Sequence, residues 1–341
     1  MEQIAFISGN TFIYWTPIVL ALAATAAAAI YAAFYVNKSQ NFLAMGASVL
    51  LSVLLAIPLA RLVHWYCYPA NYADLKTAIT DYSTGSYALL GVFAACLLTA
   101  GVLRLVRISS NLPQMLDCMA IGGGVGISIG RLASFFNASD RGMILPESVQ
   151  FPFAVPVTNA VSGAQENRLA TFMLQSGLAG AIVVMLVLFM LVQKIRKKKI
   201  ADGDIFLIFL LAYGAAQAIC DSTRYDALFF RSNGFVSMVQ IMGLLGLLVP
   251  IVVFSVRMVK SRGLKVWQFC IWTGILGLLG MSGYMEYYVQ RNAHKAVMTY
   301  SVMGSCLAVV VMLGLIIRGL ICTNVPKEEN CAAAEEPETV C

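Results

Sequence analysis

Long uninterrupted apolar runs dominate this chain of 341 residues. A helix needs ~20 apolar residues to cross a bilayer core of ~30 Å, and nine runs of about that length can be placed along the sequence. They cover about residues 12–36, 42–66, 86–106, 114–136, 170–193, 204–221, 235–259, 266–290 and 296–321. The runs are continuously apolar, whereas strands of a membrane barrel alternate apolar and polar residues. We therefore expect an all-α polytopic membrane protein with about nine transmembrane helices.

Positive charge predicts how these helices are oriented, because cytoplasmic loops retain lysine and arginine. If the N-terminus lies outside, the inner segments hold 14 of the 23 basic residues, including the run KIRKKK at 194–199. We therefore expect the N-terminus outside and the C-terminus in the cytoplasm. The run KIRKKK is then an anchor at an anionic membrane surface, and the net charge of +6 requires no nucleic-acid partner.

The chain ends and the cysteines indicate little further chemistry. The start MEQIAFISGNTFIYW lacks the basic region and the cleavage site of a signal peptide, so we expect the first run to be retained. The nine cysteines include no C-x-x-C pair, so we expect no disulfide or zinc framework, no other metal and no cofactor. The acidic, alanine-rich segment 322–341 is typical of a disordered cytoplasmic tail.

Ionisable residues inside the apolar runs are the strongest functional signal. Each costs ~2.5–3.5 kcal/mol on insertion scales unless it faces the bundle interior or water. Four places carry such residues at the predicted outer ends of helices: Arg61 with His64, Arg131, Asp221 with Arg224, and Glu286. Their common level is consistent with one polar, partly hydrated site that opens outward.

Several of these residues also have a purely structural interpretation. Arg61 can extend toward lipid headgroups, and His64 can belong to an interfacial aromatic belt. Asp221 and Arg224 are three residues apart, so they can form a simple ion pair on one helix face. Together with Tyr213 they also make a polar stripe where a lipid phosphate can bind.

Two other functions are not favoured by the sequence. The glycine-rich segment GGGVGISIGR at 122–131 lies inside an apolar run, where small residues indicate close helix packing and not a phosphate loop. A small-molecule transporter predicts internal repeats and polar residues near the middle of the membrane, and the sequence has neither.

Five segments, in order, carry a resemblance to a known family. They are IYW (13–15), ARLVHWYCY (60–68), GRLASFFN (130–137), DGDIFLIFLLAYGAAQAICDSTRYD (202–226) and FVSMVQIM (235–242). The chain resembles the prolipoprotein diacylglyceryl transferases, bacterial inner-membrane enzymes that move a diacylglyceryl group from phosphatidylglycerol to the lipobox cysteine of a preprolipoprotein. The resemblance implies a seven-helix transferase-like domain at 1–262, two additional transmembrane helices at 263–321, and the tail at 322–341.

The family signature is matched in part by GRLASFFNASD. Arg131 and Asn137 match its arginine and its second asparagine. Ser134 stands where the family has its first asparagine, and Ser139 stands where it has a glutamate, with Asp140 one position later.

The later motif is also matched in part. Tyr213 and Arg224 match its tyrosine and second arginine, whereas Gln217 replaces an arginine and the shorter Asp221 replaces a glutamate. The segment GSYALLGV at 85–92 has no histidine where the family carries one.

The resemblance implies that a thiolate displaces glycerol phosphate from the donor lipid, with arginines stabilising the leaving charge. The base is left open among Asp221, Asp140 and His64. The implied catalytic residues are Arg131, Arg224 and Asp221, and the implied substrate-binding residues are Arg61, His64, Ser134, Asn137, Gly142, Tyr213 and Gln217.

The expected partners are phosphatidylglycerol, the preprolipoprotein signal peptide with its lipobox cysteine, and membrane lipids, in the bacterial inner membrane. The alternative is a non-catalytic or specialised paralogue that binds or transports phospholipid, which the missing histidine and glutamate favour.

Overall fold

The structure is a computed structural model that describes residues 4–8, 11–39, 41–80, 87–109, 111–137, 139–159, 163–230 and 233–322. The chain divides into two compact units, Met1–Leu247 and Leu248–Cys341, and each is described by itself. Of the predicted tail, residues 323–341 lie outside the described residues. The predicted domain boundary at 262 stays a prediction.

The first unit is a bundle of apolar helices in which α5 has the most neighbours. Helices α1, α6 and α7 pack against α5, and α2 packs against α4. The bounds are α1 (Trp15–Ser39), α2 (Phe42–Cys67), α4 (Leu89–Leu105), α5 (Leu112–Arg131), α6 (Thr171–Ile195) and α7 (Asp204–Ser222). Helix α8 (Met238–Arg262) begins in this unit and continues into the second.

Glycines on α5 explain its close contacts. A Cβ atom at Gly122 would lie 2.6 Å from the carbonyl oxygen of Ala27 on α1. A Cβ atom at Gly124 would overlap Cγ2 of Val183 on α6. Since helices in lipid associate mainly through close packing, the glycine-rich segment serves helix contact, and this prediction is confirmed.

All nine predicted apolar runs contain a helix. Within the described residues, eight helices are long and apolar enough to cross a membrane: α1, α2, α5 with the turn that follows it, α6, α7, α8, α9 and α10. The third run forms α4, which has 17 residues and a length of about 26 Å, slightly short of a full span. The predicted all-α polytopic membrane protein is confirmed.

Short antiparallel hairpins were not predicted. They are β1 (Ile4–Ser8) with β2 (Thr11–Tyr14), β3 (Ala154–Thr158) with β4 (Gln165–Leu169), and β5 (Phe229–Phe230) with β6 (Asn233–Ser237). The apolar runs predicted at 12–36 and 235–259 therefore begin as strands. In the first, the sequence TFIY contains β-branched and aromatic residues that favour strands, and the helix starts only at Trp15.

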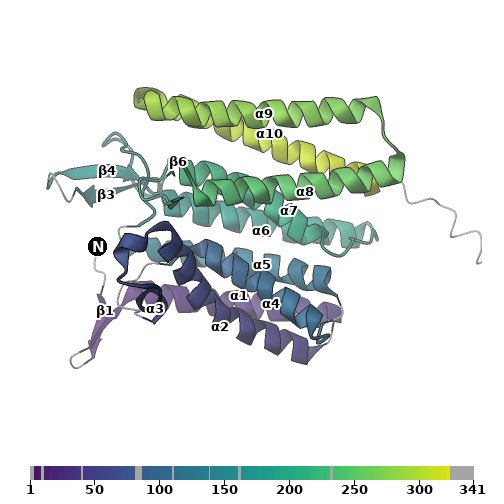
Figure 1. Cartoon of the computed structure of the whole chain (residues 1–341), viewed down its shortest axis with the longest axis horizontal. Helices are drawn as coiled ribbons and strands as arrows, with labels where there is room; N and C mark the ends of the chain where they lie inside the picture. Colours follow the sequence, from purple (N-terminus) through teal and green to yellow (C-terminus); the bar gives the residue numbers. More distant parts are fainter. Residues whose placement is uncertain are drawn as a thin grey trace, which may run out of the picture. The chain divides into compact units, whose positions relative to one another are not determined.

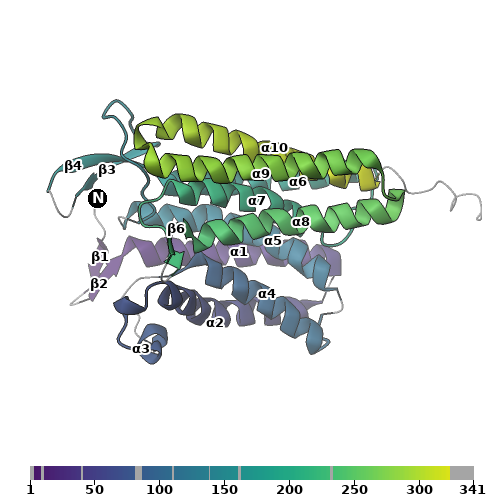
Figure 2. The ribbon, with the colours of Figure 1, turned by 45° about the horizontal axis from the view of Figure 1, so that its top comes forward.

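The hairpins of the first unit lie at one end of its helices, together with the short helix α3 (Leu75–Thr80). The same arrangement is visible in the turned view of Figure 2. Figure 1 shows the turns between α4 and α5 and between α6 and α7 at the opposite end. This second end carries the run KIRKKK, and the side of the membrane that it faces stays a prediction.

The second unit contains the rest of α8, α9 (Val266–Arg291) and α10 (Ala296–Cys322). Helices α9 and α10 pack against each other. Nε1 of Trp272 on α9 donates to Oγ of Ser255 on α8 at 3.0 Å, and Nε of Arg262 donates to the carbonyl oxygen of Leu320 at 3.0 Å. These bonds hold the ends of the three helices together.

Candidate active site

A sharp turn brings a carboxylate back to the end of α5. The helix ends at Arg131 and is followed by the 3-10 helix η2 (Leu132–Phe135). The chain then turns at Asp140, whose φ of 55° is in the left-handed region that aspartate tolerates better than most residues. The backbone N–H of Asp140 donates to Oδ2 of Asp226 at 2.9 Å, which ties the turn to the segment after α7.

Asp140 lies between two arginines. Both of its carboxylate oxygens are 3.1 Å from Nη1 of Arg131, and Oδ1 is 3.0 Å from Nη2 of Arg224. The hydroxyl of Ser134 donates to Oδ2 at 2.6 Å. From the sequence Asp140 was considered only as one of three possible bases, and the structure makes it the residue that joins the two predicted arginines.

Arg224 contacts two further carboxylates. Its Nη1 is 3.0 Å from Oδ1 of Asp221, and its Nε is 3.0 Å from Oδ1 of Asp226. Its Nη2 also donates to the carbonyl oxygen of Asp226 at 3.2 Å. The ion pair between Asp221 and Arg224 is present, but Arg224 lies beyond the end of α7 at Ser222, and the pair is one part of a larger network that uses all three guanidinium nitrogens.

We call Arg131, Asp140, Asp221, Arg224 and Asp226 the charged cluster. Burial alone would raise the pKa of Asp140, but Arg131 and Arg224 lower that pKa to about 2. For Arg224, burial acts to lower the pKa, and the three carboxylates outweigh it and raise the pKa above its usual value. Both side chains therefore stay ionised at neutral pH, and Asp140 is poorly suited to act as a general base.

Asp221 connects the charged cluster to the start of α8. The hydroxyl of Ser237 donates to Oδ2 of Asp221 and accepts the backbone N–H of Gln240 at 3.0 Å. The side chain of Gln240 in turn accepts the backbone N–H of Ser237 at 2.9 Å. Asp221 is 1% exposed and receives an arginine on one oxygen and a hydroxyl on the other, so it is rigidly held.

Polar side chains on α6 and α7 continue the site into the bundle. Tyr213, Gln217 and Gln175 are all buried, and Nε2 of Gln175 donates to Oε1 of Gln217 at 3.4 Å. Arg131 is the principal charged neighbour of Tyr213. Among the described residues, Oε1 of Gln175 and Nε of Arg131 have no hydrogen-bond partner, and the Tyr213 hydroxyl lies within reach of the Arg131 side chain. Such unused groups are costly in a buried setting and are typical of atoms whose partner is a ligand.

Asn137 and Gly142 shape the backbone around the cluster. The side-chain oxygen of Asn137 accepts from the backbone and the hydroxyl of Ser139, which closes the turn before Asp140. The N–H of Gly142 donates to the carbonyl oxygen of Leu169 at 2.8 Å, and a Cβ atom there would lie 2.6 Å from Oγ1 of Thr171. These two predicted site residues therefore lie beside the charged cluster and position it.

Arg61 and His64 make a different set of contacts. Nε of Arg61 donates to the carbonyl oxygen of Ala78 in α3 at 2.7 Å, and its guanidinium lies over the rings of Tyr72 and Tyr87, 5.4 Å from each centroid. Nδ1 of His64 is 2.8 Å from the hydroxyl of Tyr72. Arg61 is 0% exposed, so it does not extend to lipid headgroups. We call Arg61, Tyr72 and Tyr87 the aromatic cage.

The polar residues near the cluster that were not among the predicted site residues include Asp226, Ser237 and Arg141. The first two lie inside sequence segments that resemble the family, so their position there was a usable signal. Arg141 had no such signal, because nothing in the sequence indicates that this arginine of a connecting segment is buried. It is 3% exposed, and its guanidinium lies over the ring of Phe172 at 4.5 Å.

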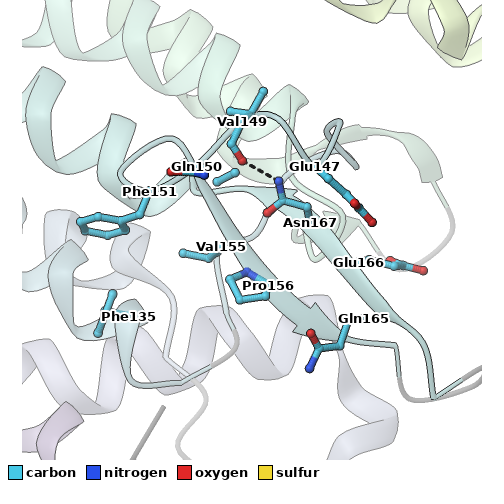
Figure 3. Close-up of a pocket in the computed structure, with 11 residues that line it drawn as sticks. Phe135, Glu147, Val149, Gln150, Phe151, Val155, Pro156, Gln165, Glu166 and Asn167 are labelled. Carbon is cyan, nitrogen blue, oxygen red and sulfur yellow. Dashed lines mark hydrogen bonds between the residues drawn. The ribbon is translucent and has the colours of Figure 1, made fainter.

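A hollow of about 500 Å³ lies next to η2, between Phe135 and the β3–β4 hairpin. Figure 3 shows the rings of Phe135 and Phe151 at one side of it and Glu147 and Glu166 at the other. Its lining among the described residues includes these two glutamates and no lysine or arginine. The hollow is therefore unsuited to binding a phosphate. The charged cluster, which contains two arginines, is better suited to it.

The carboxylates of the cluster are engaged by arginines. Among the described residues, no group of three His, Cys, Asp or Glu side chains is placed to hold a metal ion. The chemistry available in this part of the chain is that of guanidinium groups, carboxylates, hydroxyls and amides.

These features define a multi-pass membrane protein with a buried arginine–carboxylate cluster at one end of its helix bundle. A family model described as prolipoprotein diacylglyceryl transferase matches residues 3–256, and the chain belongs to this family. It is also similar to proteins named phosphatidylglycerol–prolipoprotein diacylglyceryl transferase from Streptococcus pyogenes serotype M5 (strain Manfredo), serotype M49 (strain NZ131) and serotype M1. Each is 25% identical over 230 residues, which cover 63% of this chain and 81% of the relative.

Proposed function

We propose that this chain transfers a diacylglyceryl group from phosphatidylglycerol to the lipobox cysteine of a preprolipoprotein. One observation carries the proposal: Arg131 and Arg224, distant in sequence, meet on the carboxylate of Asp140 at the end of a transferase-family bundle. Membership of the family and the names of the relatives support the same donor and acceptor classes.

The reaction is a displacement at the glycerol carbon that bears the phosphoester. The acceptor thiol releases its proton to the surrounding water, its sulfur forms a C–S bond with that carbon, and the C–O bond to the phosphate breaks. Glycerol phosphate leaves with the electron pair. Cationic hydrogen-bond donors aimed at the phosphate stabilise the developing charge. They also favour the thiolate form of the acceptor cysteine, whose thiol has a pKa of about 8.5 in water.

Arg131 is the residue of the cluster best placed to act on the leaving phosphate. Its Nη1 binds Asp140, while its buried Nε has no partner among the described residues. Arg224 and Asp221 complete the proposed catalytic set, and their mutual ion pair holds Asp140 and Arg131 in place.

The proposed substrate-binding residues divide into two groups. Tyr213 offers a buried hydroxyl beside Arg131, and Gln217 accepts a hydrogen bond from Gln175, while Ser134, Asn137 and Gly142 hold the turn around Asp140. Arg61 and His64 form the other group at the end of α2, and their part in donor binding stays a prediction. The proposed location is the bacterial inner membrane, with the cluster facing outward.

The experiment that tests this function uses purified full-length protein, phosphatidylglycerol labelled in its acyl chains, and a lipobox peptide. We expect label on the peptide and release of glycerol phosphate, with no labelling of a peptide in which serine replaces the lipobox cysteine. Lipid that is bound but never transferred would instead favour the non-catalytic phospholipid binder. That rival rests on the segment GSYALLGV at 85–92, which has no histidine where the family carries one, and on Ser139, which stands where the family has a glutamate.

A further inference from the structure

The arginines near the candidate site differ in how completely their charge is compensated. Arg224 is in contact with three carboxylates, and Arg131 is paired with Asp140. Arg141 follows Asp140 directly in the chain, yet its Nε and Nη1 are buried and have no hydrogen-bond partner among the described residues. A buried guanidinium with unused donors is costly unless a further group binds it.

The surroundings of Arg141 orient its guanidinium without using its N–H groups. The ring of Phe172, the second residue of α6, lies 4.5 Å from Cζ of Arg141. The carbonyl oxygen of Arg141 accepts the backbone N–H of Tyr225 at 3.1 Å, which ties this segment to the one that follows Arg224. A cation–π contact of this kind leaves the in-plane donors available.

The pKa shifts of Arg141 and Arg224 agree with this difference in charge compensation. Burial lowers the pKa of the Arg141 side chain, and the negative charges of Asp140 and Asp226 compensate only in part. For Arg224 the direction is opposite, because its carboxylates outweigh burial. Arg141 is therefore the cation of this region whose charge is least satisfied by the protein itself.

We propose that Arg141 binds the phosphate of the glycerophosphate group, in the donor lipid and in the glycerol phosphate that leaves it. The inference rests on the proposed function for the identity of the lipid. Arg141 lies beside the first turn of α6, and guanidinium groups bind phosphate oxygens in a bidentate manner. The carboxylates of the charged cluster already neutralise Arg224. Arg141 therefore supplies the uncompensated positive charge that binds the phosphate.

Arg168 provides a matched control. It lies in the same connecting segment, and its guanidinium also lies over an aromatic ring, that of Tyr225 at 4.6 Å. Unlike Arg141, it has a carboxylate partner, since Nη2 is 2.6 Å from Oε2 of Glu166. Substituting Arg168 therefore removes an arginine–aromatic contact without removing an unsatisfied cation.

The test measures equilibrium binding of phosphatidylglycerol and of diacylglycerol, which lacks the phosphate, to full-length protein in detergent. We expect Arg141→Gln to weaken phosphatidylglycerol binding about 10- to 100-fold, the usual range for a charged hydrogen bond, with diacylglycerol binding unchanged. Arg168→Gln should stay within about twofold of the parent on the same scale. Unchanged phosphatidylglycerol binding in Arg141→Gln, or an equal loss for both lipids, would overturn the proposal.

Glycerol 1-phosphate serves as a competitor that distinguishes the two sources of the phosphate. Competition in the parent that is lost in Arg141→Gln shows that the site also binds the free phosphate ester, and competition that persists in the variant contradicts the proposal.

If Arg141→Gln does not fold, Arg141→Lys replaces it; an intermediate loss of phosphatidylglycerol affinity is expected, and full affinity contradicts the role of the guanidinium. Binding is measured without acceptor, so a protein that binds through Arg141 but never transfers lipid disproves the proposed function and leaves this inference standing.

Discussion

The charged cluster and the aromatic cage compensate the charge of a buried arginine in different ways. Both contain a buried arginine at the end of a helix in the first unit. In the charged cluster, Arg224 is compensated by three carboxylates, whereas in the aromatic cage Arg61 is held by a carbonyl oxygen and two tyrosine rings. The first arrangement fixes charges that can act on a substrate, and the second anchors α3 to α2.

The largest expected effect comes from removing the central arginine of the cluster. Arg224→Met leaves Asp140, Asp221 and Asp226 facing the single charge of Arg131. Breaking a buried ion pair by removing one partner costs about 3–5 kcal/mol, so we expect a marked fall in the unfolding midpoint in detergent and loss of lipid transfer. A variant with the midpoint of the parent would show that the carboxylates do not depend on Arg224.

A smaller loss is expected in the aromatic cage. Arg61→Met removes the hydrogen bond to Ala78 and the contacts with Tyr72 and Tyr87, together with the buried charge itself. From the loss of these contacts we expect a loss of about 2 kcal/mol and faster hydrogen exchange in α3, with exchange near Asp140 unchanged. Faster exchange at the turn of Asp140 would show that the two regions are one structure.

The pH dependence of stability should distinguish the regions as well. The pKa of Asp140 is lowered from 3.8 to about 2, so its stabilising effect is complete above about pH 4 and is lost as the pH falls toward 2. The lost increment is about 2 kcal/mol, measurable from unfolding midpoints at pH 7, 4 and 3. Asp140→Asn should lack this increment at neutral pH and show a flatter profile between pH 4 and 2; a slope equal to that of the parent would assign the effect to another group.

The smallest expected effect is the coupling energy between the aromatic cage and the charged cluster. Substitutions at separate sites without shared partners add within about 0.5 kcal/mol. The double variant Arg61→Met with Arg224→Met should therefore lose the sum of the two single losses in unfolding free energy. A coupling energy above about 1 kcal/mol would mean that the aromatic cage and the charged cluster stabilise each other directly.

The apolar runs were sufficient to predict the long helices, because crossing a bilayer imposes both length and composition, but they did not predict the short helix α3. The same reasoning missed the hairpins, since short strands outside the membrane carry no comparable constraint. It also extended the helix at 235–259 over β6, where an apolar sequence alone does not distinguish strand from helix.

The site was predictable where the sequence carried a motif. Arg131 and Arg224 belong to segments that resemble the family, and the structure brings both to one carboxylate. The central role of Asp140 depends on a left-handed turn, which no pattern of residue types fixes. The grouping of Arg61 with the other ionisable residues as one site rested on their common level in the membrane, and only tertiary packing shows that its contacts are with Tyr72 and Tyr87.

The most direct test of the account compares Arg131→Gln with Arg61→Gln in the transfer of labelled diacylglyceryl from phosphatidylglycerol to a lipobox peptide. If the charged cluster acts on the leaving phosphate, Arg131→Gln should lower kcat/KM about 100- to 1000-fold while the protein stays folded. Arg61→Gln should lower it less than about 10-fold. Equal losses in the two variants, or full transfer by Arg131→Gln, would contradict the assignment of the reaction to the charged cluster.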